Sequence, residues 1–280
     1  MVGSVGERAT VRFDELGGYY TLVLPAQAGK PLGCGPALGP AHAPPGGCQF
    51  CPGREHDMGA ALAVRGDPWT ARASLNKWPV GSGHAVVVLS RRHVGLYDVT
   101  PAEWAAALEV VADLAAGPDA VVFANHGLDA GASQPHAHAQ VMTIDGAGHP
   151  LGDLAAATGP GCVLCRDKLP DDVVFAIGGW VCLSPAAPRS SGELRLVADT
   201  HRDGWEPALG AALAMVLGRV RVVLGEVGLN VVFHLGPGAH AHVHVLPRPG
   251  PITVYRLGWD LSVSTDPSAY AAALVAAAVS

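Results

Sequence analysis

The sequence contains few charged residues, and this scarcity excludes several classes of protein. Charged residues make up 15% of the 280 positions and hydrophobic residues 49%, a balance that favours a folded domain over a disordered chain. Acidic residues outnumber basic ones by 24 to 18, and Lys and Arg form no run that could follow a phosphate backbone. A nucleic acid polymer is therefore not an expected partner.

Long apolar runs of the kind that cross membranes are also missing. The segment Met1–Asp14 is charged and interrupted by glycine, so it lacks the apolar core of a secretion signal. The apolar stretch Ala269–Val279 is shorter than the roughly 20 residues that a membrane span needs. We therefore expect a cytoplasmic protein with reduced thiols and no membrane partner.

Cysteine is scarce, but four of the six cysteines form two Cys-x-x-Cys pairs. The pairs are Cys48 with Cys51 and Cys162 with Cys165. In a reducing compartment such a pair is typical of half a zinc site or of a redox motif. Each of the two remaining cysteines stands alone, and we expect both to be small buried hydrophobic residues.

The residues that could bind metals occur in the same order in each half, which predicts an internal repeat. A Cys-x-x-Cys pair is followed by a single histidine and then by a His-x-His pair, at intervals on the order of 40 residues. The first half contains Cys48, Cys51, His93, His136 and His138, and the second contains Cys162, Cys165, His201, His240 and His242.

The segments between these residues predict the same succession of strands and one helix in both halves. The first half has expected strands at 83–89, 120–124 and 137–144 and an expected helix at 101–116. The second half has expected strands at 192–197, 230–234 and 241–246 and an expected helix at 207–224. Thr100 precedes the first helix with Glu103 three residues later, which is the pattern of a capping box.

This succession predicts an α+β protein made of two fused modules, each an antiparallel sheet with one packed helix. We place the modules at residues 1–150 and 151–280, joined across the Gly- and Pro-rich stretch Gly146–Gly161.

Each half also contains the ligands of a closed tetrahedral metal site. Structural zinc is held by four thiolates and imidazoles. The first predicted set is Cys48, Cys51, His93 and His136, and the second is Cys162, Cys165, His201 and His240. For one Cys-x-x-Cys pair, a redox motif or chance would be an equal alternative, and the matched second copy favours metal binding. The alternative to metal binding for His93 and His201 is that each is a solvated loop residue.

The densest group of chemically active residues lies between Asn125 and Gln140. Alternate side chains of a strand share one face, so His136, His138 and Gln140 are predicted to point the same way, about 7 Å apart. A neutral imidazole needs no deprotonation at pH 7, so His138 could attack phosphorus while its neighbour binds the metal. The alternative is a sequence that merely alternates on an exposed strand.

Two kinds of group are predicted to bind the phosphate beside His138. The Gln140 amide would donate to the oxygens whose charge grows in the transition state. The small residues Ala130–Ser133 are expected to leave backbone N–H groups free for a phosphate, and Ser133 adds a hydroxyl.

Three stretches of the sequence resemble the galactose-1-phosphate uridylyltransferase family of the histidine-triad superfamily. Residues 48–53 are similar to its zinc loop, residues 75–79 to its nucleotide-side loop and residues 130–140 to its active-site signature. The resemblance implies a duplicated histidine-triad-like fold in which His136 binds zinc, His138 becomes nucleotidylated and Gln140 bonds to the phosphate.

The same resemblance implies further substrate contacts. Asn76, Asn125 and Ser133 match positions that contact the ribose and phosphates. The other expected substrate-binding residues are Lys77, Ala132, Trp259 and Asp260, of which the last two lie at the tip of the loop 252–260, which would face the sugar. In the segment 26–31, where the family has arginines, only Lys30 is a cation, and lysine cannot make bidentate phosphate contacts.

The implied reaction is a ping-pong transfer between a nucleoside diphosphate sugar and a sugar 1-phosphate. The alternatives are phosphorolysis or hydrolysis of a nucleoside diphosphate sugar or dinucleotide, as in ADP-glucose phosphorylase relatives, and a zinc-stabilised nucleotide-binding protein without activity. The expected cofactor is zinc in the first site and zinc or iron in the second. A homodimer is the expected assembly.

The stretch 240–246 of the second half contains a complete histidine triad. It would be a second metal-binding strand, or a competing active site with His242 as nucleophile. The preceding loop, 235–239, lacks the serine and glutamine that accompany His138, which favours the metal-binding strand.

Overall fold

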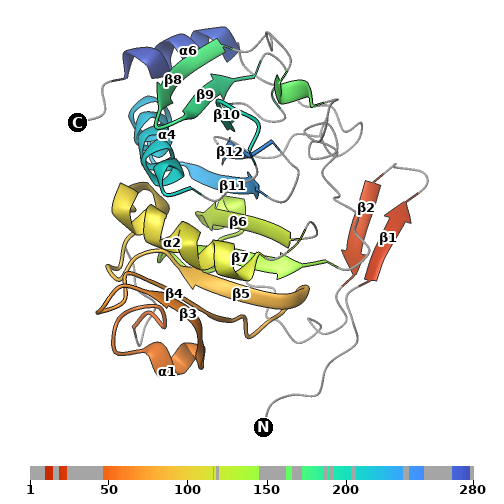
Figure 1. The fold of residues 1–280 in the computed structure, drawn as a ribbon, viewed down its shortest axis with the longest axis vertical. Coiled ribbons are helices and arrows are strands. Elements are labelled where there is room, and N and C mark those ends of the chain that lie inside the picture. Colours follow the sequence, from red (N-terminus) through yellow and green to blue (C-terminus); the bar gives the residue numbers. More distant parts are fainter. Residues whose placement is uncertain are drawn as a thin grey trace.

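A ten-stranded antiparallel sheet forms the centre of the protein, in the order β3-β4-β5-β7-β6-β11-β12-β10-β9-β8 (Figure 1). This computed structural model describes residues 10–14, 19–23, 47–115, 117, 120–144, 162–165, 172–185, 188, 192–202, 206–235, 240–248 and 267–277. Two further strands, β1 (Thr10–Asp14) and β2 (Tyr19–Val23), pair only with each other among these residues.

The helices and strands that the sequence predicts are all present, with ends that differ by no more than two residues. The first half contributes β3 (Ala61–Arg65), β4 (Ala71–Leu75), β5 (Ser82–Val88), β6 (Ala120–His126) and β7 (His138–Thr143), with α1 (Glu55–Met58) and α2 (Pro101–Leu114). The second half contributes β8 (Asp172–Ile177), β9 (Trp180–Ser184), β10 (Leu194–Ala198), β11 (Gly228–His234) and β12 (His242–Arg248), with α4 (Ala208–Leu224) and α6 (Pro267–Ala276).

The two halves repeat one strand order and meet at β6 and β11. The α+β class and the duplication are confirmed, but the two predicted sheets are parts of one continuous sheet. Phe123 of β6 pairs with Val232 of β11, and these residues lie opposite Gln140 and His244 in their own halves. Equivalent positions therefore face each other across an approximate two-fold axis. This pairing satisfies backbone groups that a separate sheet would leave unpaired at its edge.

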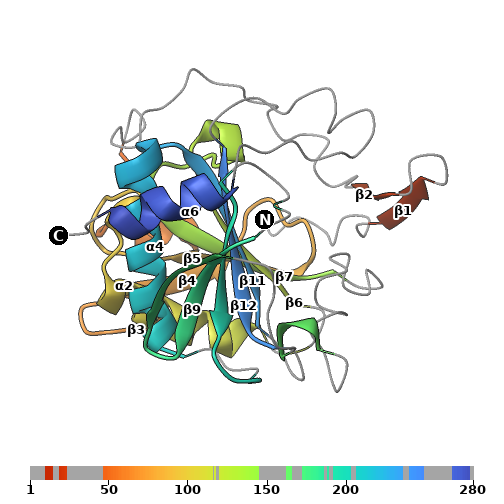
Figure 2. The same cartoon turned by 90° about the horizontal axis from the view of Figure 1, so that it is seen from above.

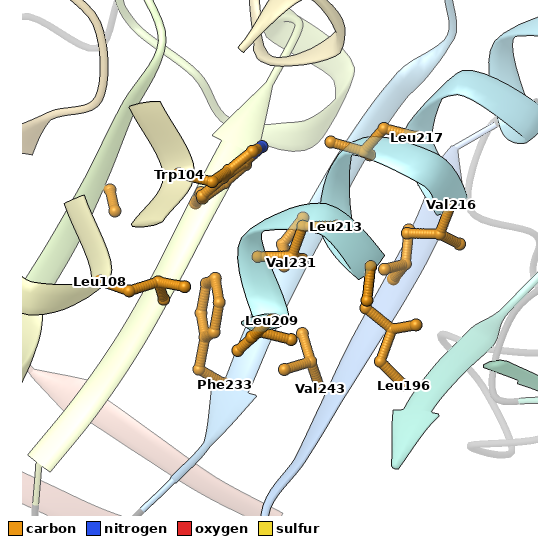
Figure 3. Close-up of a cluster of buried hydrophobic side chains, with 14 of the residues drawn as sticks. Trp104, Leu108, Leu196, Leu209, Leu213, Val216, Leu217, Val231, Phe233 and Val243 are labelled. Carbon is orange, nitrogen blue, oxygen red and sulfur yellow. The ribbon is translucent and has the colours of Figure 1, made fainter. Parts of the chain in front are cut away.

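One face of the sheet is covered by α2 and α4, which lie side by side (Figure 2). Gly210 permits their close approach, because a Cβ there would lie 2.6 Å from the carbonyl oxygen of Pro101. Figure 3 shows the core between the helices and the sheet, formed by Trp104, Leu108, Leu196, Leu209, Leu213, Val216, Leu217, Val231, Phe233 and Val243. Each such side chain contributes about 1.5–3 kcal/mol on burial. Within the described residues, none of the helices is both long and apolar enough to span a bilayer.

Alternation along the strands directs a second set of side chains to the other face of the sheet. Val87 and Ala139 belong to the core beneath the helices, whereas Val86 and Val88 form a smaller cluster with Phe50. His138 and Gln140 alternate with Ala139 on β7 and so face this second cluster. The helix side therefore stabilises the sheet, and the opposite side is available for polar chemistry.

The predicted capping box at the start of α2 is present and forms part of a larger network. The backbone N–H of Glu103 donates to Thr100 Oγ1 at 3.3 Å, and the Thr100 N–H donates to the Glu103 carboxylate at 2.9 Å. Ser90 and Arg92 donate to the same carboxylate at 2.6 and 2.7 Å. Burial raises the pKa of Glu103, but these hydrogen bonds outweigh it and lower the pKa to about 2.

We expect Glu103→Gln to lower the free energy of unfolding by about 1–3 kcal/mol at pH 7. The folded-state pKa lies below the unfolded value of about 4.3, so the stabilisation is complete above that pH and disappears as the pH falls towards 2. Urea unfolding at a series of pH values measures this. Glu109→Gln is the control, because its half-exposed pairing with Arg65 should contribute less than about 1 kcal/mol. Equal losses in the two variants would contradict the network's role.

Candidate functional site

The four predicted ligands of the first half meet beside the start of β7. Cys48 Sγ lies 3.5 Å from His136 Nδ1, and Cys51 Sγ lies 3.3 Å from His93 Nδ1 and 3.7 Å from His136 Nδ1. Tetrahedral zinc with ordinary bond lengths places sulfur and nitrogen ligands about 3.5 Å apart. The set can hold a metal ion and is compatible with zinc.

The tautomer of His136 leaves the nitrogen that faces both cysteines available to a metal ion. Its Nε2–H donates to the Ser90 carbonyl at 2.8 Å, and burial lowers the pKa of His136 to about 4. The neutral ring therefore has an Nδ1 without hydrogen, and the lone pair of that nitrogen is available to a metal ion. Burial also raises the pKa of the Cys51 thiol to about 11, so a cation is required to hold the thiolate.

The second half repeats this arrangement with the other predicted set. Cys162 Sγ lies 3.6 Å from His240 Nδ1, and Cys165 Sγ lies 3.1 Å from His201 Nδ1 and 3.2 Å from His240 Nδ1. The Nε2–H of His240 donates to the Ala198 carbonyl at 2.7 Å, as His136 does to Ser90. The sequence-based prediction of two Cys2His2 sets is therefore matched by the geometry.

His138, the predicted nucleophile, lies in a buried position at the beginning of β7. Its Nδ1–H donates to the His136 carbonyl at 2.9 Å, which leaves Nε2 as the nitrogen with a lone pair. Burial lowers the pKa of His138, so the ring is neutral at pH 7. His138 lines a cavity of about 570 Å³ with Gln49, Phe50, Met58, Leu75, Asn76, Lys77, Trp78, Val80, His84, Val86, Gly131, Ser133, Gln134 and Gln140.

Phe50 connects the Cys-x-x-Cys loop to His138. Its ring centroid lies 5.2 Å from that of His138 and 6.0 Å from that of His136. Gln49 of the same loop also lines the cavity. A metal that orders Cys48 and Cys51 would therefore also order a wall of the cavity that His138 lines.

The loop before His136 corrects one expectation. The N–H groups of Ala130, Gly131 and Ala132 donate to carbonyls within the loop, at 3.2, 2.9 and 3.0 Å, and so are not free for a phosphate as predicted. Gly127 and Gly131, at φ of +81° and +83°, turn the backbone back on itself and create these bonds. Ala132 is buried, whereas the exposed Ser133 does line the cavity.

The other predicted substrate contacts divide into three groups. Asn76 and Lys77 line the cavity. Asn125 does not line it within the described part of the chain, and its Oδ1 accepts from Asn230 Nδ2 at 2.8 Å across the β6–β11 junction. Trp259 and Asp260 lie outside the described residues, as do Lys30 and the loop 252–260.

Three further residues of the site, His84, His234 and Glu193, were missed in the sequence. His84 contacts Gln140, and His234 and Glu193 join His242 and His244 in a buried cluster. His244 Nδ1–H donates to Glu193 Oε1 at 2.8 Å, and the rings of His234 and His242 stack at 4.5 Å. The three imidazoles could hold a metal ion. His242 thus lies beside two further imidazoles, those of His234 and His244. This supports the interpretation of β12 as a metal-binding strand.

The chain is similar to known proteins both in sequence and in fold. No protein-family profile matches the chain. Over 240 residues it is 26% identical to ADP-glucose phosphorylase of Arabidopsis thaliana, covering 69% of this chain and 68% of that protein. A crystal structure of ADP-glucose phosphorylase from Arabidopsis thaliana with bound ADP-glucose superimposes with a TM-score of 0.70 at 19% identity, covering 98% and 100% of the two chains. A uridylyltransferase structure gives 0.72 at 22% identity, covering 95% and 97%.

We expect Cys51→Ser to remove one bound metal ion per chain and to lower the melting temperature, because metal binding and folding are linked. Elemental analysis and thermal unfolding of the same sample measure both. Cys182→Ala is the matched control: this buried cysteine lies outside the metal-type clusters, so its loss should lower the melting temperature without changing the metal content. If Cys51→Ser bound as much metal as the unaltered protein, the Cys2His2 set of the first half would not be a metal site.

Proposed function

Because the chain has the fold of the galactose-1-phosphate uridylyltransferase-like proteins of the histidine-triad superfamily, we propose that it is a nucleotidyltransferase acting through His138. The observation that supports this best is the environment of His138. Its ring is neutral, its Nδ1 is held by a carbonyl, and it lines a cavity with the Gln140 amide. These are the requirements for an imidazole that attacks phosphorus.

In the first step, His138 Nε2 forms a bond to the α-phosphorus of a nucleoside diphosphate sugar. The bond from that phosphorus to the bridging oxygen breaks, and sugar 1-phosphate leaves with the electron pair. The His136 carbonyl, which accepts from Nδ1–H, stabilises the positive charge that develops on the ring. In the second step a sugar 1-phosphate oxygen attacks the same phosphorus and releases neutral His138.

The proposed metals are structural. Zinc would be held by Cys48, Cys51, His93 and His136, and zinc or iron by Cys162, Cys165, His201 and His240. Bound there, the ions would cross-link loops and strands. In the first half that cross-link would hold Phe50 against His138 and keep the His136 carbonyl in place for His138.

A second candidate reaction uses inorganic phosphate as the acceptor. The relative with 26% identity is an ADP-glucose phosphorylase. Lys77 is the only Lys or Arg among the described residues that line the cavity, and it is available to either a sugar 1-phosphate or inorganic phosphate. Both reactions share the first step and differ only in what attacks the nucleotidyl-histidine.

The first step is tested by intact-protein mass spectrometry after separate incubation with UDP-glucose, ADP-glucose and GDP-sugars. We expect one donor to add the mass of its nucleoside monophosphate, and His138→Ala to abolish the adduct while binding metal normally. His242→Ala is the matched control and should retain the adduct. An adduct that survives in His138→Ala and disappears in His242→Ala would place the nucleophile in the second half.

The second step is tested by offering the isolated nucleotidyl-protein either a sugar 1-phosphate or inorganic phosphate. We expect release of a nucleoside diphosphate sugar with the former, which chromatography separates from the nucleoside diphosphate that phosphate would produce. If only phosphate removes the nucleotidyl group, the reaction is phosphorolysis and not transfer to a sugar 1-phosphate. Discharge at the same rate in buffer alone would indicate a hydrolase.

A further inference from the structure

His84 is a buried histidine at the cavity wall to which neither the sequence motifs nor the proposed reaction assigns a role. It is 3% exposed and lies on β5, beside β7. Its Nε2 is 2.9 Å from Gln140 Oε1, and its Nδ1 is 2.9 Å from the backbone nitrogen of Val80. It therefore contacts the residue proposed to bind the phosphate.

The bond from Val80 determines the tautomer of His84. A backbone N–H can only donate, so His84 Nδ1 must be the nitrogen without hydrogen. The neutral ring then has its hydrogen on Nε2. Of the two side chains near that atom, Asn76 places its Nδ2 at 3.0 Å and Gln140 its Oε1 at 2.9 Å, and only the oxygen can accept. His84 thus donates to Gln140.

This bond selects one of two orientations of the Gln140 amide. With Oε1 held by His84, the NH2 group of Gln140 is directed away from His84 and provides donors to the cavity that both residues line. The reverse orientation would present a carbonyl oxygen to an anionic phosphate, which is repulsive. We propose that His84 is a positioning residue that fixes the Gln140 amide for phosphate binding, an inference that rests on the proposed function.

The second half contains the same connection with different residues. Val86 is the pairing partner of Gln140, and Arg195 is the pairing partner of His244. His84 and Glu193 each stand two residues before that partner, and Glu193 accepts from His244 at 2.8 Å. In both halves, the residue at this position bonds to a side chain of the neighbouring strand, Gln140 or His244. That bond therefore determines which atoms of Gln140 or His244 remain for a ligand.

Without His84, both amide orientations become accessible and the phosphate loses part of its stabilisation in the transition state. We expect His84→Phe, which keeps the ring volume but removes both hydrogen bonds, to slow nucleotidylation of His138 by roughly 10- to 100-fold. His84→Gln can accept from Val80 and donate to Gln140, so it should restore most of the rate. His56→Phe is the control on an exposed histidine and should have no effect.

A double-mutant cycle separates positioning from a general structural effect. If His84 acts through Gln140, then His84→Phe should slow the reaction less than about threefold when Gln140 is already alanine, because the amide to be positioned is gone. If the rate loss of the double variant equals the product of the losses of the two single variants, the two residues act independently and the proposal is overturned. Rapid-quench measurement of the covalent adduct gives the rate of the step without contributions from product release.

A nuclear magnetic resonance experiment tests the geometry without any substrate. We expect ¹⁵N–¹H correlation spectra to show hydrogen on His84 Nε2 and not on Nδ1, and one sharp pair of side-chain NH2 signals at a single ¹⁵N shift for Gln140, assigned by its loss in Gln140→Ala. In His84→Phe that pair should broaden, or a second pair should appear beside it. Hydrogen on Nδ1, or an unchanged Gln140 signal, would contradict the proposal even if the protein transfers nucleotides. If no nucleotidylation occurs but these signals appear as expected, the proposed function fails and the His84–Gln140 bond stands.

Discussion

Backbone carbonyl groups determine which nitrogen of each site histidine is available. The Ser90 carbonyl accepts from His136 Nε2, so Nδ1 remains for a metal, and the His136 carbonyl accepts from His138 Nδ1, so Nε2 remains for the proposed attack on phosphorus. Two histidines with one residue between them thereby acquire different roles. A carbonyl is held by its strand or loop, so these roles depend on the sheet that positions the chain.

The second half uses the same carbonyl bonds and yet forms a different site. His240 and His242 are held by the Ala198 and His240 carbonyls as their counterparts are. The difference arises at neighbouring positions, where His244 replaces Gln140 and Glu193 replaces His84. An amide and its donor suit a phosphate, whereas several imidazoles beside a carboxylate suit a metal ion. The sheet and its carbonyl bonds fix the positions of the side chains, and the residue types at a few positions determine which ligand each site suits.

Much of this arrangement was predictable because it depends on local patterns. Alternation and helix periodicity indicated the central strands and helices, and repeated spacing indicated both Cys2His2 sets. The outer strands β3, β4, β8 and β9 were not predicted, since they are short, and β3 and β8 are also partly exposed. His84, Glu193 and His234 were missed because only the strand register brings them to the site. The bonded loop amides at 130–132 depend on turn geometry that composition does not reveal.

The junction of β6 with β11 has a consequence for how such a chain could arise. Two identical copies of one half, joined edge to edge through this antiparallel strand, would form a closed symmetric dimer with two identical pockets. Fusing the copies into one polypeptide removes the requirement that both pockets stay the same. One can then retain the reactive histidine while the other gains ligands that strengthen the fold, a division of labour that separate identical subunits cannot evolve.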